Sequence, residues 1–284
     1  MPSDNSLFAY VNHQLEPYHL ANLHISDLSV QRGYGIFDFL KMSGTKGLFL
    51  KDYLDRFYRS AELMELQVPV TRDKLKAKIT ELADLNKLEQ SGIKMILTGG
   101  YSANGYDPGD PNLIIIQQPL TLPTPEMVSK GIKIITYEHA RELALAKTIN
   151  YTTGIRLIKK IREKGADDVL YYADGKLLEF PRCNLFVVTQ DNTIVTPDKN
   201  VLQGITRKNV LQLASQKYKA EARTVTLEDL ARAKEVFLTS TTKRILPIVQ
   251  VDDLVIGDGK PGEVTMELLR DLIALEEAYL KAVT

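Results

Sequence analysis

The sequence predicts a mixed α/β (α+β) chain whose second half is richer in short strands than its first. Apolar residues recur at spacings of three and four after Asp52, as on the buried face of a helix. β-Branched runs at residues 93–98 and 113–118 predict a strand pair, and short runs after Asp168 alternate with turn signals. Helix and sheet periods in one chain indicate packed layers of both.

The first half opens with an expected strand at residues 7–11 and a polar segment that holds three histidines. Their spacing puts no two of them on one helical face, so we expect loop positions and no metal site. A glycine turn then leads into a strand with two distinct faces. The two faces carry Ile36, Asp38 and Leu40 on one side and Phe37, Phe39 and Lys41 on the other.

Two helices are expected next, one from Asp52, in which Arg56 is the odd charged member, and one from residue 71. The strand pair that follows encloses a glycine-rich loop at residues 99–111, and loops of that length are more often functional or mobile than idle. Prolines cluster just after the pair. We therefore expect a small domain at residues 1–118, a linker at 119–127 and a large domain at 128–284.

The large domain should contain a strand-rich run with tight turns at Asp174-Gly175 and Asp191-Asn192. A capping box with Asp in place of Glu marks a helix start at Thr226. The other expected elements are strands at 132–136, 168–172, 177–179, 185–188, 193–195, 235–239 and 245–251 and helices at 154–164, from 204, and 263–282.

Composition narrows the function classes. The 284 residues include 36 basic and 36 acidic side chains, so the chain has no electrostatic signature of nucleic-acid or anionic-membrane binding. No apolar run is long enough to span a bilayer, and the single cysteine cannot form an internal disulfide. We expect a soluble, cytoplasmic enzyme that acts on small molecules.

Three stretches together suggest a pyridoxal-phosphate site. Lys147 stands among small and polar residues before a helical pattern, and such surroundings favour loss of its proton for imine formation. Glu179 is a carboxylate inside an apolar stretch, where it could keep a pyridine nitrogen protonated. Taken alone, Lys147 reads as a surface lysine and Glu179 as the partner of a nearby arginine such as Arg182.

The third stretch is a phosphate-binding candidate. Gly204, Ile205 and Thr206 begin a helix, whose first amides and dipole favour an anion. Further donors are the hydroxyls and amides of Ser240, Thr241 and Thr242, and the guanidinium of Arg56. Each also has an ordinary reading, as a helix cap, a turn or a surface ion pair.

Taken in order, these stretches resemble the fold-type IV pyridoxal-phosphate enzymes, the class IV aminotransferase family. That family comprises branched-chain aminotransferases, D-amino-acid aminotransferases and aminodeoxychorismate lyases. The resemblance runs from about residue 30 to 270. It implies a small N-terminal α/β domain, a larger C-terminal pseudo-barrel domain, the cofactor pyridoxal 5′-phosphate and a homodimer in which the 99–111 loop of one subunit closes the other's site.

Site residues follow from the resemblance position by position. Lys147 would be the Schiff-base lysine and proton carrier, and Glu179 the partner of the pyridine nitrogen. The remaining cofactor contacts would be Arg56, Tyr151, Leu202, Gly204, Ile205, Thr206, Ser240, Thr241 and Thr242.

The substrate side departs from the family pattern. Phe180, Pro181 and Arg182 stand where small residues usually follow the glutamate, and the 99–111 loop lacks the arginine and histidine of the Bacillus-like D-amino-acid enzymes. A side chain that holds the substrate carboxylate would then be Lys41, Arg32 or Arg182. The expected pocket is lined by Phe37, Phe39, Leu40 and Tyr101.

The sequence therefore predicts an aminotransferase that moves an amino group between an amino acid with an apolar or modest side chain and a 2-oxo acid. The alternatives are a D-amino-acid aminotransferase with unusual carboxylate recognition and a 4-amino-4-deoxychorismate lyase. A protein that keeps the fold without catalysis is a further possibility, against which Lys147 and Glu179 argue.

Overall fold

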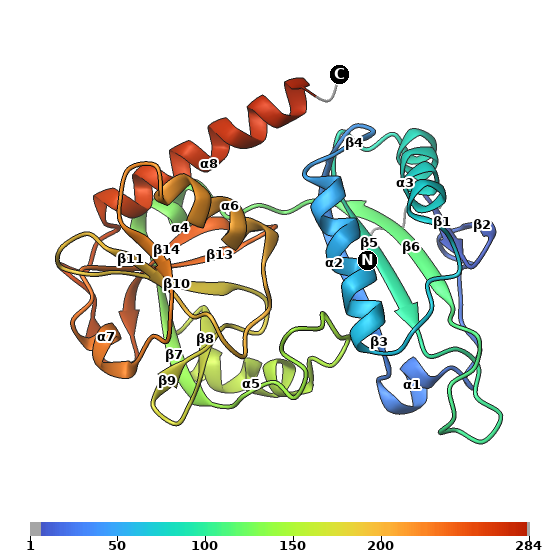
Figure 1. Ribbon diagram of the computed structural model, residues 1–284, viewed down its shortest axis with the longest axis horizontal. Helices are drawn as coiled ribbons and strands as arrows, with labels where there is room; N and C mark the ends of the chain where they lie inside the picture. The colour runs from blue at the N-terminus through green and yellow to red at the C-terminus, as the bar shows by residue number, and fades with distance from the viewer. Residues whose placement is uncertain (1–6, 283–284) are drawn as a thin grey trace. The chain divides into compact units, whose positions relative to one another are not determined.

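A computed structural model describes residues 7–282, and the chain divides into two compact units (Figure 1). The first unit contains the described residues up to Thr121, the segment Ala146–Asn150, and the described residues from Tyr279 onward. The second contains Leu122–Leu145 and Tyr151–Ala278. Three separate segments of the chain thus form the first unit, and Lys147 lies in the second of these segments.

The first unit is an antiparallel sheet with two helices against one face (Figure 1). Its six strands lie in the order β2-β1-β6-β5-β3-β4. Its elements are β1 (Phe8–Val11), β2 (Gln14–Pro17), α1 (Leu28–Arg32), β3 (Gly35–Ser43), β4 (Lys46–Gly47), α2 (Leu50–Leu63), α3 (Arg72–Asn86), β5 (Gln90–Thr98) and β6 (Leu113–Pro119).

The alternation predicted for β3 is confirmed. Ile36, Asp38 and Leu40 are fully buried, whereas Phe37 and Phe39 are half-buried on the other face. The buried face packs against α2, whose apolar residues at helical spacing meet the strand, because both elements lose apolar surface to water there.

The loop between β5 and β6 is fixed at its base by the fully buried carboxylate of Asp27. The hydroxyl of Thr98 and the amide of Asn112 each donate to Asp27 Oδ2 at 2.7 Å. The amide of Ser29 donates to the other oxygen at 2.8 Å, which caps α1. One carboxylate therefore ties both ends of the loop to α1.

The second unit is built on a nine-stranded sheet that curls into a half-barrel. Its order is β12-β11-β10-β13-β14-β7-β8-β9, with β15 paired to β14. Its elements are α4 (Pro125–Lys130), β7 (Ile132–Glu138), α5 (Thr152–Glu163), β8 (Asp168–Ala173), β9 (Lys176–Leu177), β10 (Asn184–Val188), β11 (Ile194–Thr196), α6 (Ile205–Ala214), β12 (Ala220–Ala222), α7 (Leu227–Ala231), β13 (Glu235–Ser240), β14 (Arg244–Val251), β15 (Leu254–Val255) and α8 (Glu263–Ala282).

Both predicted hairpins of this unit are confirmed, β8 with β9 and β10 with β11, and so is the capping box at Thr226. The strand expected at residues 177–179 is shorter than predicted. β9 ends at Leu177, and the chain then makes a tight turn in which the amide of Phe180 donates to the carbonyl of Cys183 at 2.9 Å. Backbone hydrogen bonds still join the chain to β8 beyond Leu177, since Leu178 donates to Tyr171 and Tyr171 donates to Glu179, both at 2.9 Å.

Candidate functional site

The segment that carries Lys147 adds to the edge of the first unit's sheet. The amide of Phe37 donates to the carbonyl of Lys147 at 2.9 Å, and the amide of Ile149 donates to that of Gly35 at 3.1 Å. The amide of Lys147 also donates to the buried hydroxyl of Ser60 on α2 at 3.1 Å. Three hydrogen bonds thus hold the segment around Lys147, two of them at Lys147 itself and one at Ile149.

The Lys147 ammonium lies over the phenyl ring of Phe37, 4.6 Å from the ring centroid. The hydrogen-bond pattern places Lys147 opposite Phe37, on the face of the sheet that α2 does not cover. Gly35 permits this approach, because a Cβ there would lie 2.7 Å from the carbonyl oxygen of Leu97 and 3.2 Å from Ile149. The absence of a side chain at Gly35 therefore lets the segment that carries Lys147 lie beside β3.

Glu179 is buried in the second unit and pairs with an arginine, though not with Arg182. Nε and Nη2 of Arg141 donate to Glu179 Oε1 at 2.8 and 2.6 Å. The amide of Leu202 donates to Oε2 at 3.0 Å. Arg182 is exposed. Hydrogen bonds from a guanidinium and a backbone amide stabilise the ionised form of a carboxylate.

The sequence did not point to Arg141. Arg141 follows β7 and Glu179 follows β9, so the two side chains meet only in the folded chain. Nη2 also donates to the carbonyl of Ala144 at 2.7 Å, which fixes the guanidinium plane. Burial and the nearby Arg141 charge lower the pKa of His139.

The N-terminus of α6 has the form expected of an anion site. Gly204 is its N-cap, no side chain caps the first amides, and the first turn holds no acidic residue. A Cβ at Gly204 would lie 2.1 Å from Asn184 Oδ1, and the Asn184 amide donates to the carbonyl of Leu202 at 2.8 Å. Glycine is therefore needed to let Asn184 hold the chain that leads into Ile205 and Thr206.

The hydroxyl-rich turn between β13 and β14 is anchored by the two basic residues that follow it. The Lys243 ammonium pairs with the buried Asp168 carboxylate at 2.7 Å, and its amide donates to Ser240 Oγ at 3.0 Å. Arg244 pairs with Glu276 of α8 at 2.8 Å and has a left-handed φ of 55°. The turn with Thr241 and Thr242 is thus held from two sides.

Arg56 forms a bidentate ion pair with Asp38 inside the first unit. Nε and Nη2 of Arg56 donate to the two carboxylate oxygens at 2.9 and 2.6 Å. The guanidinium also lies 5.3 Å from the ring centroid of Tyr53. Asp38 is fully buried, so this is not the surface ion pair that the sequence left open.

The predicted substrate residues fall into two groups. Phe37 and Lys41 lie on the uncovered face of β3, and the Lys41 side chain is buried. Arg32, Tyr101 and Arg182 are exposed; the ring of Tyr101 packs edge-on against His24 in the 99–111 loop.

One expectation about the pocket lining is wrong, and the bulky residue after Glu179 lies in the core. Leu40 is fully buried on the covered face of β3 with Asp38, so it cannot share a lining with Phe37. Phe180 is buried in an apolar cluster of the second unit with Leu185 and Leu238, so its bulk fills the core.

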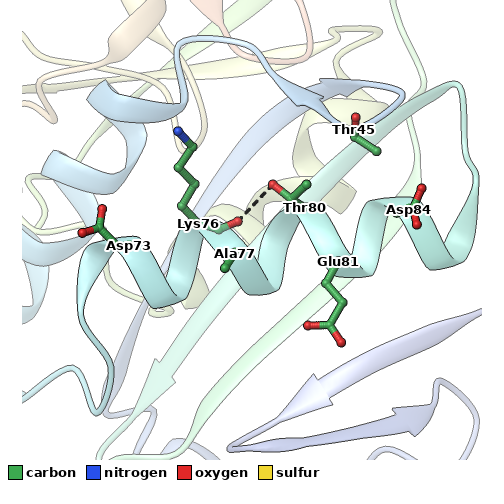
Figure 2. A pocket seen from close by; sticks show the side chains of 7 residues that line it. All are labelled: Thr45, Asp73, Lys76, Ala77, Thr80, Glu81 and Asp84. Atoms are coloured by element: carbon green, nitrogen blue, oxygen red, sulfur yellow. Dashed lines mark hydrogen bonds between the residues drawn. The ribbon is translucent and has the colours of Figure 1, made fainter.

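A surface hollow elsewhere lacks comparable chemistry. It lies along α3 and is lined by Thr45, Asp73, Lys76, Ala77, Thr80, Glu81 and Asp84 (Figure 2). The hydrogen bond within it runs from the Thr80 hydroxyl to the Lys76 carbonyl at 3.2 Å, inside the helix itself. Across residues 7–282, histidine, cysteine and acidic side chains nowhere gather in a group that could hold a metal. In the same range no helix combines the length and apolar character needed to cross a membrane.

Comparison with known proteins places these features in context. The family model described as amino-transferase class IV matches residues 35–251. The chain is 28% identical over 247 residues to a D-alanine aminotransferase of Bacillus licheniformis, covering 85% of this chain and 87% of that protein. It is 28% identical over 272 residues to a putative branched-chain-amino-acid aminotransferase of Methanocaldococcus jannaschii, covering 91% and 93%.

The fold is shared with solved structures. The T.th. branched-chain amino acid aminotransferase complexed with N-(5′-phosphopyridoxyl)-L-glutamate has a TM-score of 0.88 at 23% identity, covering 96% of this chain and 95% of that one. The Escherichia coli branched-chain amino acid aminotransferase has a TM-score of 0.86 at 22% identity, covering 95% and 94%. At these identities the likeness concerns the fold alone.

Proposed function

Because the chain belongs to the class IV aminotransferase family, we propose that it uses pyridoxal 5′-phosphate to move an amino group between an amino acid and a 2-oxo acid. We propose an amino acid with an apolar or modest side chain. The observation that carries the proposal is Lys147, which is hydrogen-bonded into a sheet edge beside Phe37. A bound pyridoxal phosphate supplies an electron sink for the charge left at the substrate α-carbon.

Lys147 is assigned the proton chemistry. Its amine would hold the cofactor at rest and, once a substrate amine is bound there instead, would accept the substrate's α-proton and later give up that proton. The three backbone hydrogen bonds of the Lys147 segment support this role, because a proton carrier must return to one position in each half-reaction.

Glu179 is assigned the pyridine nitrogen. Its ionisation by Arg141 and the Leu202 amide supports that role, since an ionised carboxylate favours the protonated ring. Leu202 is assigned an apolar contact to the ring, and Tyr151, which precedes α5, a place near the phenolic oxygen.

The phosphate is assigned to three groups: the start of α6, the turn after β13, and Arg56. The uncapped amides at the start of α6 support this assignment, because the first turn of that helix holds no acidic residue, and the hydroxyls of the anchored turn after β13 add further donors. Arg56 adds a permanent positive charge. The residues assigned are Arg56, Gly204, Ile205, Thr206, Ser240, Thr241 and Thr242.

The substrate is assigned to Phe37, Lys41, Tyr101, Arg32 and Arg182. Phe37 has the firmest support, since its ring touches the Lys147 ammonium. Lys41 shares the face of β3 with it. Arg32, Tyr101 and Arg182 are exposed side chains and would act at the entrance.

We also propose a cytoplasmic homodimer with a small domain at residues 1–118, a linker at 119–127 and a large domain at 128–284. The family resemblance supports the dimer. The single buried cysteine suits a reducing compartment. The break between the compact units after Thr121 supports the boundary.

A second candidate is a D-amino-acid aminotransferase, favoured by the similarity to the Bacillus licheniformis D-alanine enzyme. The two candidates differ in substrate chirality and share every cofactor residue named above.

The test is a panel of amino acids in both enantiomers, incubated with the holoenzyme while the cofactor absorbance is recorded. The proposal predicts rapid conversion of the cofactor band by one or more amino acids and its reversal by a 2-oxo acid. Formation of 4-aminobenzoate from aminodeoxychorismate without an amino acceptor would show a lyase instead.

A further inference from the structure

The irregular segment between β11 and α6 has both of its ends joined by one side chain, that of Arg207. At the end of β11, Nε of Arg207 donates to the hydroxyl of Thr196 at 3.2 Å, and Nη2 donates to the carbonyl of Pro197 at 2.8 Å. At the other end, Nη1 donates to Oε1 of Gln203 at 2.8 Å. The guanidinium of Arg207 therefore fixes the span of residues 196–203.

This segment carries the Leu202 peptide, which contacts both ends of the proposed cofactor site. The amide of Leu202 donates to Glu179 Oε2 at 3.0 Å. Its carbonyl accepts from the amide of Gly204 at 2.9 Å and from the side-chain amide of Asn184 at 2.8 Å. Glu179 is assigned to the pyridine nitrogen, and Gly204 precedes the amides of α6 that are assigned to the phosphate. A shift of the segment would therefore disturb both assignments at once.

The Arg207 guanidinium is buried, and its charge has no carboxylate partner. Arg207 is 5% exposed, and the hydroxyl, carbonyl and amide oxygens that accept from it are all neutral. Within residues 7–282 no carboxylate forms an ion pair with it, and Asp198 and Glu179 act on it only at longer range. Burial lowers the pKa of Arg207, and these two charges oppose that shift. Because an arginine stays protonated in proteins, a desolvated positive charge remains here.

The place of this charge in α6 favours an anion beside it. Gly204 is the N-cap of α6, so Arg207 lies in the first turn of the helix. The helix dipole gives that turn a positive potential, which stabilises anionic side chains and disfavours cationic ones. The first turn holds no acidic residue, and no side chain caps its amides. Two sources of positive potential thus meet at the start of α6, and the first turn supplies no negative charge to balance them.

We propose that Arg207 is a positioning residue that makes this site select a cofactor with a phosphate group. Its hydrogen bonds hold the segment that presents Leu202 and Gly204, and its charge adds to the dipole of α6. A phosphate dianion at the first amides of α6 balances both sources of positive potential. This inference rests on the proposed pyridoxal-phosphate function and deepens it, since the residues assigned to the phosphate above do not include Arg207.

A purely structural role for Arg207 predicts a different binding pattern. If Arg207 only held the segment, its loss would weaken the binding of pyridoxal 5′-phosphate and of pyridoxal, which lacks the phosphate, by the same factor. If its charge also acts on the phosphate, the loss is larger for pyridoxal 5′-phosphate. A buried charge near the phosphate is expected to contribute on the order of tenfold in affinity. The ratio of the two affinities therefore separates the two roles.

The experiment measures the binding of pyridoxal 5′-phosphate, pyridoxal and inorganic phosphate to the full-length apoprotein by titration calorimetry. Gln203→Glu keeps an acceptor for Nη1 of Arg207 and gives the guanidinium a carboxylate partner. It should leave the unfolding midpoint unchanged or higher, and weaken pyridoxal 5′-phosphate relative to pyridoxal by roughly tenfold. Lys208→Gln removes one positive charge from the next, exposed position of α6 and is the matched control, which should change that ratio by less than about twofold.

Two substitutions of Arg207 itself complete the test. Arg207→Met removes both the hydrogen bonds and the charge, so it should weaken pyridoxal 5′-phosphate at least about tenfold more than pyridoxal. Arg207→Lys keeps the charge and cannot reach both ends of the segment, so it should restore most of the affinity ratio without restoring the unfolding midpoint. If Arg207→Met does not fold, Gln203→Glu still decides, because it leaves Arg207 in place.

Equal losses of pyridoxal 5′-phosphate and pyridoxal in Arg207→Met overturn the proposal, as does an unchanged ratio in Gln203→Glu. A ratio that falls as far in Lys208→Gln also overturns it, because net charge near α6 would then explain the effect. Weaker binding of inorganic phosphate by Arg207→Met and Gln203→Glu, with Lys208→Gln unchanged, supports it. A wild-type protein that shows this dependence on Arg207 but converts no amino acid would contradict the proposed aminotransferase function and leave this inference intact.

Discussion

Replacing Arg141 by methionine tests the electrostatic support of Glu179. The change removes the hydrogen bonds of 2.8 and 2.6 Å that Arg141 donates to a carboxylate that is 4% exposed. Breaking a buried ion pair from one side costs about 3 to 5 kcal/mol, which lowers the unfolding midpoint of a domain of this size by roughly 6 to 20 °C. The chain has no tryptophan, so far-UV circular dichroism is the natural probe.

A double variant separates charge from packing. Arg141→Met with Glu179→Gln removes the uncompensated charge, so it should be more stable than Arg141→Met alone. Arg182→Met is the control, since an exposed arginine should change stability by no more than about 0.5 kcal/mol. The reasoning is refuted if Arg141→Met loses less than about 1 kcal/mol, or if the double variant gains nothing over it.

Three further predictions concern other buried groups. Asp38→Asn removes the charge opposite Arg56, so unfolding free energy should fall by about 3 kcal/mol; a loss below about 1 kcal/mol would count against the pair. Lys243→Met removes the ion pair with Asp168 beneath the turn, so it should weaken the binding of pyridoxal phosphate at least tenfold more than the binding of pyridoxal. Equal losses of affinity would show that the turn does not bind the phosphate. Burial raises the pKa of Cys183 to about 11, so iodoacetamide at pH 8, below that pKa, should label the unfolded chain and spare the folded one.

The residues proposed for the cofactor could be chosen from the sequence because they lie in short stretches with recognisable local patterns. A lysine before a helix, a glutamate after a hairpin and a glycine before an uncapped helix each carry a recognisable pattern, and their order suggested the family. The family, the fold-type IV architecture and the aminotransferase class are confirmed by the matches over residues 35–251 and by the shared fold.

The partners of those residues were not predictable. Arg141 pairs with Glu179, and Asp38 pairs with Arg56, only because stretches that are apart in the sequence fold together. Neither stretch contains a pattern that identifies the residue it pairs with. Nor does the sequence show that Ala146–Asn150 extends the first unit's sheet, since five residues carry no strand period.

One error in the substrate half was avoidable. Alternation along the strand already placed Leu40 and Phe37 on opposite faces, so assigning both to one pocket contradicted the strand period itself. Assigning each residue of the strand to its face would have corrected that expectation.

The central claim is that Lys147 carries the cofactor, and borohydride reduction tests it most directly. Wild-type holoenzyme is reduced, digested and analysed by mass spectrometry for peptides that bear a pyridoxyl phosphate group. The account predicts the added mass on Lys147 and its absence from the same peptide of Lys147→Ala. The added mass on Lys94, Lys41 or any other lysine of the wild-type protein, with Lys147 unmodified, would contradict it.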